Sequence, residues 1–255
     1  MVYEMTNMDV VKEIFADWEE TLIWSCLQGV MGKIYVDDEK NPKSAMAILG
    51  DFAFLAGNPN SSLVSFKPDW FQNSFVIMVP QTKEWGKLIE ACYGVDTKKV
   101  TRYAIQKEKD IFDTDRLQQM VNGLPCEYEV SMIEESLFIQ CKAESWSQDL
   151  VGQYSTYADY RKFGIGVVVL KDNKIVAGAS SYSRYEEGIE IEIDTKEDYR
   201  RKGLATVCGA KLILECLKKG LYPSWDAQNL WSVALAEKLG YHFSHEYDAY
   251  EVLQY

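Results

Sequence analysis

The stretch from Glu190 to Ala205, EIEIDTKEDYRRKGLA, carries acidic and basic side chains around one glycine. Isoleucines alternate with acids over residues 189–194, which predicts a strand with one apolar and one acidic face. A polar turn and a basic run follow, and Gly203 then opens an apolar segment that we expect to be helical to about Lys219. This order of strand, basic turn and helix start is suited to holding an anion.

The anion-binding chemistry would come mainly from the backbone. The first amides of a helix have no partner within the helix, and the helix dipole adds about half a positive charge there. Gly203 lets the backbone approach a ligand without a Cβ in the way. The other interpretation is an ordinary strand-to-helix turn with a solvated basic surface, and this stretch alone does not exclude it.

The acidic face of the predicted strand offers a general base. Its carboxylates are those of Glu190, Glu192 and Asp194, which share one face because strand side chains alternate. Like charges two residues apart raise the pKa of at least one member, which favours such a role. The alternative is the solvated face of an antiparallel strand.

Composition narrows the classes of partner. The chain has 255 residues and a net charge of −12, which disfavours nucleic acid and anionic membranes and favours a cationic small molecule. No apolar run reaches the roughly 18 to 20 residues of a membrane helix, and the N-terminus lacks the basic region of a secretory signal. We therefore expect a cytoplasmic protein.

The six cysteines form no C-x-x-C pair, and there are two histidines, so we expect reduced, mostly buried thiols and no metal site.

The order of predicted elements indicates an α+β protein of two parts. Residues 1–125 show a helix over 9–28, then strands, a helix and a strand, without a catalytic constellation. Asn122-Gly123 and Pro125 mark our boundary, and residues 126–255 form the second domain. There we expect a helix over 147–160, a hairpin turning at Asp172-Asn173, the central strand and its helix, a short strand, a helix over 229–239 and a last strand.

The second domain resembles the GCN5-related N-acetyltransferase (GNAT) superfamily, whose fold has a central, mostly antiparallel sheet. The resemblance rests on a (Gln/Arg)-x-x-Gly-x-(Gly/Ala) loop met by Arg200, Gly203 and Ala205, on the strand before it, and on a helix that ends Lys238-Leu239-Gly240-Tyr241. The block after Gly203 also looks like a bacterial zwittermicin-resistance subgroup with an extra N-terminal half. The order of elements in residues 1–125 raises the suspicion of a degenerate second copy of this fold.

The resemblance implies roles for particular residues. The pyrophosphate of acetyl-CoA would lie on the loop and helix start, formed by Arg200, Arg201, Lys202, Gly203, Leu204, Ala205 and Thr206. The pantetheine arm would pair with the backbone of Ile193, Asp194 and Thr195, and one of these amides would polarise the thioester carbonyl. Asn229 would bond the pantetheine, although a role as helix N-cap is equally open and compatible.

The resemblance departs from the family pattern at Ala236. Many members carry a tyrosine there that protonates the leaving thiolate. Because a thiol has a pKa of about 8.5, a thiolate can leave unassisted near neutral pH at a modest penalty. Ser232, Tyr199, Tyr247 or water are the substitutes that remain open.

We therefore expect an acetyl-CoA-dependent N-acetyltransferase that transfers the acetyl group directly to the amine of a small, cationic acceptor. Glu192 is the first choice for the base and Glu190 the second. We expect a monomer or homodimer. The alternatives are an inactive acyl-CoA-binding regulatory module and a protein N-acetyltransferase.

Overall fold

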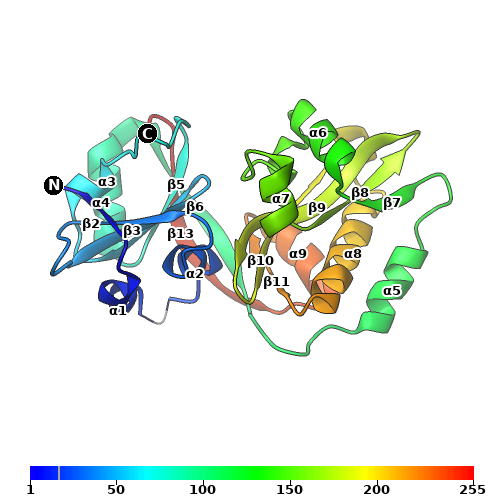
Figure 1. Cartoon of the computed structure of the whole chain (residues 1–255), viewed down its shortest axis with the longest axis horizontal. Helices are drawn as coiled ribbons and strands as arrows, with labels where there is room; N and C mark the ends of the chain where they lie inside the picture. The colour runs from blue at the N-terminus through cyan, green and yellow to red at the C-terminus, as the bar shows by residue number, and fades with distance from the viewer. Residues whose placement is uncertain (17) are drawn as a thin grey trace. The chain divides into compact units, whose positions relative to one another are not determined.

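Contacts divide the chain into two compact units. The computed structural model describes residues 1–16 and 18–255 (Figure 1). One unit comprises Met1–Arg102 with Glu246–Tyr255, and the other comprises Tyr103–His245. These limits differ from a division at residue 125, because Leu117 belongs to the core of the second unit and the last strand pairs within the first.

The first unit is a sheet with short helices. Its strands follow the order β1-β2-β3-β4-β5, and the end of β13 pairs with β5. The meander of β2, β3 and β4 is antiparallel, and β4 and β5 are parallel. Its elements are β1 (Tyr3–Met5), η1 (Met8–Val10), α1 (Lys12–Phe15), α2 (Thr21–Leu27), β2 (Lys33–Val36), β3 (Ser44–Leu49), β4 (Phe52–Gly57), α3 (Ser61–Val64), β5 (Val76–Pro80), α4 (Lys83–Tyr93) and η2 (Gly94–Asp96).

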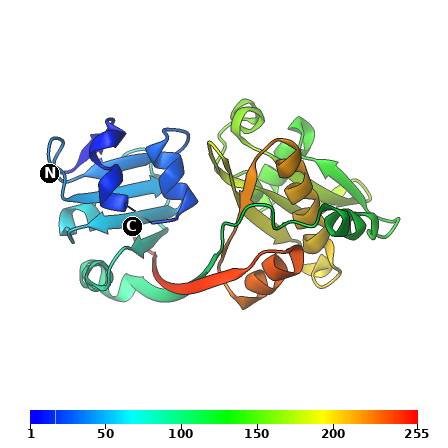
Figure 2. The same ribbon diagram turned by 90° about the horizontal axis from the view of Figure 1, so that it is seen from below.

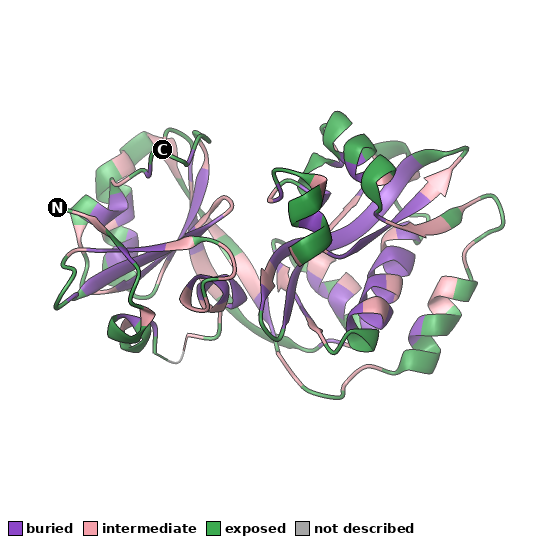
Figure 3. Cartoon of the chain, viewed as in Figure 1, coloured by how far each residue is buried: buried purple, intermediate pink, exposed green. Residues whose placement is uncertain are grey.

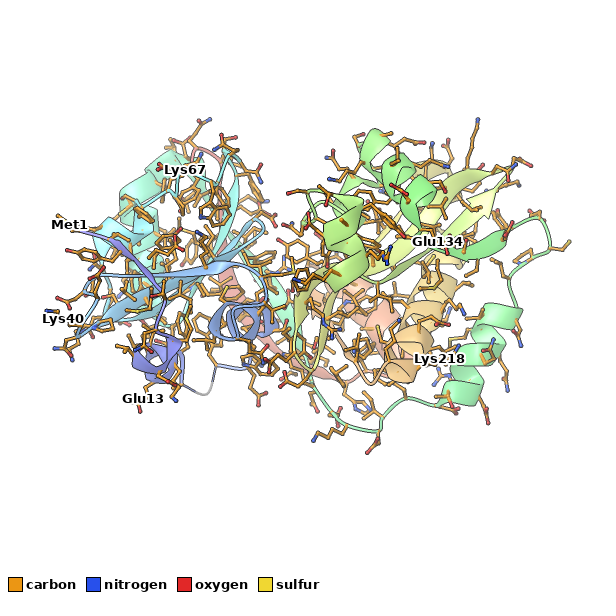
Figure 4. All side chains as sticks on the ribbon, viewed as in Figure 1. Met1, Glu13, Lys40, Lys67, Glu134 and Lys218 are labelled. Carbon is orange, nitrogen blue, oxygen red and sulfur yellow. The ribbon has the colours of Figure 1, made fainter. Side chains whose placement is uncertain are left out.

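The C-terminus is tied into this unit by specific contacts. Val252 is fully buried beside Val76, and the carbonyl of Tyr255 accepts a hydrogen bond of 2.8 Å from Lys67 Nζ, labelled in Figure 4. Tyr255 also stacks edge-on against Phe71 with ring centroids 5.2 Å apart. Residues at the very end of the sequence therefore complete the core of the first unit.

The second unit has a five-stranded sheet in the order β11-β10-β9-β8-β7. Two further strands, β6 (Thr97–Ile105) and β13 (Phe243–Val252), contribute residues to both units (Figure 2). The other elements are α5 (Thr114–Asn122), β7 (Glu129–Met132), α6 (Glu135–Ala143), η3 (Gln148–Leu150), α7 (Tyr157–Phe163), β8 (Gly166–Lys171), β9 (Lys174–Tyr185), β10 (Gly188–Thr195), η4 (Glu197–Tyr199), α8 (Leu204–Lys218), β11 (Tyr222–Ser224), β12 (Asp226–Ala227) and α9 (Leu230–Leu239).

Helix α8 is the main buried element of the second unit. It packs on β8, β9 and β10, and the apolar side chains of these strands join it in one core. Figure 3 shows α8 and the neighbouring strands mostly buried, whereas α5, α6 and α7 are mostly exposed. At its exposed end Lys218, labelled in Figure 4, pairs with Glu215 at 2.9 Å.

The two units repeat one order of elements. In each, a first strand is followed by two helices, three antiparallel strands, a helix, a parallel strand, a helix and a last strand. The pairing repeats as well, because β4 is parallel to β5 just as β10 is parallel to β11. This agrees with the suspicion of a second, degenerate copy and with the predicted α+β class.

Two predicted helices are wrong in extent. The helix expected over 9–28 is broken into η1, α1 and α2, because Ala16 adopts a φ of 38° and Trp18 packs edge-on against Phe54; residue 17 lies outside the described residues. The helix expected over 147–160 begins only at Tyr157, where Thr156 and Asp159 form a capping box.

The turn between β8 and β9 follows the prediction. Asp172 and Asn173 have φ values of 51° and 61°, as a two-residue hairpin turn requires. In the part of the chain that the structure describes, no helix has the length and apolar character to cross a membrane.

Val252→Ala tests whether the last strand belongs to the first unit's core. Deleting two buried methyl groups should lower the free energy of unfolding by about 2 kcal/mol, because the surroundings only partly collapse. Urea unfolding measures it, and Leu253→Ala, at a position 52% exposed, is the control. Equal effects of the two variants would contradict the pairing of β13 with β5.

Candidate active site

The parallel pairing of β10 with β11 ends abruptly. Only three residue pairs join the strands, from Gly188 with Tyr222 to Glu190 with Ser224. Beyond Ser224 the chain turns away, and β12 pairs with β6 instead. Within the described residues, Ile191–Thr195 therefore has a strand partner on one side only, namely β9.

An irregularity in the sheet lies next to this separation. One step along β10, from Glu190 to Ile191, corresponds to two steps along β9, from Ser183 to Ser181. The extra residue is therefore Tyr182, and it forms a β-bulge. Bulges bend a strand and increase its twist, so this one turns the second half of β10 away from the direction of β11.

The free edge of β10 presents amides that its own side chains cover. The amide of Lys196 bonds to Val176 of β9, so the alternate amides of Ile193 and Thr195 point to the other edge. Ile193 N donates to Glu192 Oε1 at 3.1 Å, and Thr195 N donates to Asp194 Oδ1 at 2.6 Å. Both amides belong to Ile193–Thr195, the segment that the family resemblance assigns to the pantetheine arm.

The loop after β10 is held by backbone contacts. Arg200 Nε donates to the carbonyl of Thr195 at 3.1 Å, which fixes the start of the loop to the end of the strand. Lys202 Nζ lies 4.9 Å from the centroid of the Tyr199 ring. Arg201 and Gly203 have φ values of 61° and 79°, whereas the φ of Lys202 between them is not positive. Alternation of this kind turns successive amides to one side, as in anion-binding loops.

The N-terminus of α8 is open to a ligand. Gly203 is its N-cap, and no side chain caps the helix. A Cβ at Gly203 would meet no atom within 4 Å, so the positive φ, rather than a neighbouring side chain, accounts for the glycine. The amides of Leu204, Ala205 and Thr206 are thus available to an anion, with the dipole of a 15-residue helix behind them.

The three predicted carboxylates lie on the face of β10 away from α8. Ile189, Ile191 and Ile193 belong to the core around α8, so the alternate side chains point the other way. Glu190 is 7% exposed, and Glu192 and Asp194 are half-buried, so this is not the solvated face that the sequence left open. Burial raises the pKa of Asp194, and the charge of Asp149 in η3 adds to that shift.

Glu190 lies in a group of tyrosines where the strands separate. Burial raises the pKa of Tyr185 above its usual value, and the Glu190 charge adds to the shift although a bond to Ser224 opposes it. Burial likewise raises the pKa of Tyr222 to about 12, again with a contribution from Glu190. A carboxylate and neutral phenols thus occupy the point of separation.

Helix α9 places the remaining predicted residues. Asn229 is its N-cap and accepts a hydrogen bond from Ser232 N at 3.0 Å. Ser232 Oγ accepts a bond from Trp225 Nε1 at 3.0 Å, which leaves its own proton available. Ala236 is fully buried one turn further along, and Tyr247 belongs to the other unit.

The described residues of the first unit lack the features of such a site. Pairing of β4 with β5 continues over Phe52–Leu55 and is extended by a bond from Gln81 N to the carbonyl of Leu55. The helix that follows, α3, has four residues, and Asn60 caps it through its side chain. Strand β4 therefore has no free edge comparable with that of β10 over these residues.

Comparison with known proteins agrees with this geometry. The model of the GNAT acetyltransferase family matches residues 12–250. The chain belongs to the GNAT acetyltransferase family. It is similar to the uncharacterized N-acetyltransferase YdfB of Bacillus subtilis strain 168, with 26% identity over 251 residues and 94% of each protein covered. The protein is accordingly an acyltransferase of the N-acetyltransferase type.

Solved structures support the fold of this GNAT protein. A GCN5-related N-acetyltransferase-like protein from Streptococcus suis 89/1591 is 47% identical, with a TM-score of 0.90 over 96% of this chain and 97% of that one. A Drosophila protein, 11% identical, has a TM-score of 0.65 over 98% of each chain and shows a likeness of fold alone.

The structure brings the predicted site residues of this GNAT protein into the second unit, except Tyr247. The strand end, the loop and the start of α8 follow one another directly, and α9 packs on α8. His242 pairs with Glu108 at 2.6 Å and His245 with Ser244 at 3.0 Å, so the histidines form separate contacts. No group of metal-ligating side chains occurs among the described residues.

Sequence reasoning missed the residues that surround the carboxylates. Asp149 and Tyr185 are far from the motif in sequence, and only the packing of η3 and β9 brings them near it. Of the six cysteines, four are buried and Cys92 and Cys126 are exposed, as the expectation of mostly buried thiols allows. For Asp149 a signal existed, because Gly152 interrupts the helical pattern and indicates a loop there.

Asp194→Asn tests the desolvation of that carboxylate. A raised pKa in the folded state means that Asp194 favours folding below its unfolded-state pKa and that this contribution is lost as pH rises through the folded value. The variant's gain in unfolding free energy over the wild type should therefore grow as the pH rises from below the usual Asp pKa of about 3.9 through the raised folded-state value. Asp198→Asn removes the same charge from an exposed position. Parallel pH profiles for the two variants would contradict the burial.

Proposed function

We propose that the second unit transfers an acetyl group from acetyl-CoA to the amine of a small cationic acceptor. The observation that carries the proposal is the separation of β10 from β11, followed at once by a basic loop and an uncapped helix start. A strand edge suits the amide-rich pantetheine arm, and the loop suits the pyrophosphate. The narrower likeness to the zwittermicin-resistance subgroup stays a prediction.

The loop residues would hold the phosphates through backbone amides. Arg200 is anchored to Thr195, so the loop is set before a ligand arrives, and Arg201 and Lys202 are exposed and add charge. Leu204 is buried and fixes the helix start by packing, which leaves its amide to bind. Thr206 and Ala205 follow in the same turn. Asn229 caps α9 through its side-chain oxygen, and its side-chain NH₂ remains a donor for pantetheine.

The carboxylates would remove the proton that keeps the ammonium form of the acceptor from acting as a nucleophile. An alkylammonium has a pKa of about 10.4, so the nucleophile must lose a proton before attack. Glu192 stands at the free edge and is the first choice for the base, directly or through water, with Glu190 second. The amine nitrogen then forms a bond to the thioester carbon, and an edge amide of β10 stabilises the oxyanion.

The reaction closes when the carbon–sulfur bond breaks and the thiolate takes up a proton. Ser232 is the candidate donor, because Trp225 fixes its oxygen while its proton stays free. Water can serve as well, since the leaving thiol has a pKa of about 8.5. The carboxylate face and the net charge of −12 favour an acceptor that carries positive charge beyond the reacting amine.

Ala236 motivates a second candidate, a module that binds acyl-CoA without catalysis. It lacks the tyrosine that protonates the thiolate in many relatives. Thiol release with a panel of polyamines, amino sugars, amino acids and a lysine peptide separates the candidates. Binding of CoA with no release from any amine would select the module, and release with the peptide alone would select a protein acetyltransferase.

Gly203→Trp should abolish binding of acetyl-CoA. Acetyl-CoA at 100 times its Kd should stabilise the wild type by about 2.7 kcal/mol and raise its Tm by a few degrees, which thermal unfolding measures. Gly220→Trp is a matched control at the other end of α8, because Gly220 also has a positive φ and open space at its Cβ. A normal rise in Gly203→Trp would show that the loop does not hold the phosphates.

Glu192→Gln should slow acetylation while binding of CoA persists. The glutamine oxygen can still accept the Ile193 amide, but it cannot take a proton, so kcat should fall by about 10²–10⁴-fold. Thiol release at saturating acetyl-CoA gives kcat, and calorimetry gives the Kd of CoA. Glu237→Gln, on the exposed side of α9, should leave both unchanged. A loss in Glu190→Gln with full activity in Glu192→Gln would reverse our choice of base.

A further inference from the structure

The pairing of β10 with β11 is short for a structure on which the proposed active site depends. The pairing of β10 with β11 runs only from Gly188 to Glu190, and both strands diverge immediately afterwards. Short parallel pairings hold their register weakly, so other contacts have to keep β11 in place. Side chains from both sides of β11 supply them.

Tyr185 reaches β11 by crossing β10. Its hydroxyl lies 2.9 Å from Ser224 Oγ, although Tyr185 belongs to β9 and β10 lies between the two strands. The crossing is possible because residue 188 is glycine. A Cβ there would lie 2.5 Å from Tyr185 Oη and 2.1 Å from the carbonyl of Tyr222. One phenol thereby joins β9 to β11 across β10.

The bond between Tyr185 and Ser224 lies at the last residue pair before β10 and β11 separate. Ser224 is the partner of Glu190, and both Tyr185 and Ser224 are buried, at 2% and 0% exposure. On its other side β11 is held by Tyr241 Oη, which donates to the carbonyl of Pro223 at 2.6 Å. The hydroxyl of Tyr185 thus fixes the strand on which Glu190 depends for its place.

We propose that Tyr185, through its bond to Ser224, is a positioning residue for acetyl transfer: it sets where β10 and β11 separate and so where Glu190 and the edge amides stand relative to the acyl group. This inference rests on the proposed function. Because the proposed phosphate-binding loop begins at Arg200, ten residues after Glu190, and has its own anchor at Thr195, Tyr185 should affect the chemical step more than the binding of CoA.

A second tyrosine of this unit provides a matched control. Tyr154 Oη lies 2.9 Å from Ser181 Oγ, and both residues are buried, at 2% and 1% exposure. Ser181 also belongs to β9 but stands opposite Ile191, an apolar residue. The similar pair of Tyr160 and Ser180 is less suitable, because Ser180 stands opposite Glu192. Tyr154→Phe therefore removes the same bond away from the last residue pair.

The experiment compares Tyr185→Phe with Tyr154→Phe in the full chain. Both variants lose one buried hydrogen bond, so the Tm of each should fall by about 2–4 °C. Only Tyr185→Phe should lower kcat, by about tenfold or more, with the KM for acetyl-CoA and the Kd of CoA within about twofold of the wild type. Thiol release with the best amine of the panel gives kcat and KM, and calorimetry gives the Kd.

Two further variants separate positioning from stability. Tyr185→Phe combined with Ser224→Ala leaves no unpaired hydroxyl, so the Tm should recover while kcat stays low. Ser224→Ala alone should reproduce the loss of kcat and replaces Tyr185→Phe if that variant does not fold. Hydrogen exchange of the peptide that covers Gly188–Glu190 should quicken in each variant that lacks the bond, and not in Tyr154→Phe.

The outcomes separate the two proposals. Equal kcat values for Tyr185→Phe and Tyr154→Phe, or recovery of kcat together with Tm in the double variant, would overturn the positioning role. A wild type that neither binds CoA nor releases thiol would overturn the proposed function instead, and unchanged exchange at Gly188–Glu190 would then reject the contact independently of activity.

Discussion

The constraint on which the site depends is that every backbone amide near the protein interior needs a partner. Where β11 leaves β10, the amides of Ile193 and Thr195 lose the neighbour that a continued sheet would give them. The carboxylates of Glu192 and Asp194 take that place. A buried amide without a partner costs about 1–3 kcal/mol, so the two carboxylates stabilise a strand edge that, in our proposal, they later release to the pantetheine arm.

The two units show what the same order of elements yields with and without that separation. In the first, β4 stays paired with β5 through Leu55, and Asn60 satisfies the start of a four-residue helix. In the second, pairing stops at Glu190, and Gly203 is the N-cap of a helix that no side chain caps. In the first unit, the corresponding strand edge and helix start have partners. In the described residues of the second, a strand edge without a neighbouring strand is followed by a helix start without a side-chain cap. The acyltransferase chemistry of this family therefore belongs to the second unit in our proposal.

Local patterns in the sequence predict the parts of the site that local physics decides. The alternation over residues 189–194 gives the strand and its faces, and Asp172-Asn173 gives the hairpin, because the side-chain period and the turn geometry are properties of short segments. The break near Ala16 and the late start of α7 were missed, since tertiary packing and a capping box override an apolar stripe. The pairing of β13 with β5, and the bond of Tyr185 to Ser224, join residues too distant in sequence for any local pattern to indicate them.

The alanine at position 236 agrees with the packing around it. Ala236 is fully buried in the core of the second unit. Helices α8 and α9 approach closely at Leu239, because a Cβ at Gly209 would lie 2.7 Å from Leu239 Cδ1. A tyrosine at a fully buried alanine position overpacks the core unless its ring leaves the core. In our proposal, Ser232, which lies one turn earlier on the same face of α9 and keeps a free proton, takes the role that the tyrosine fills in many relatives.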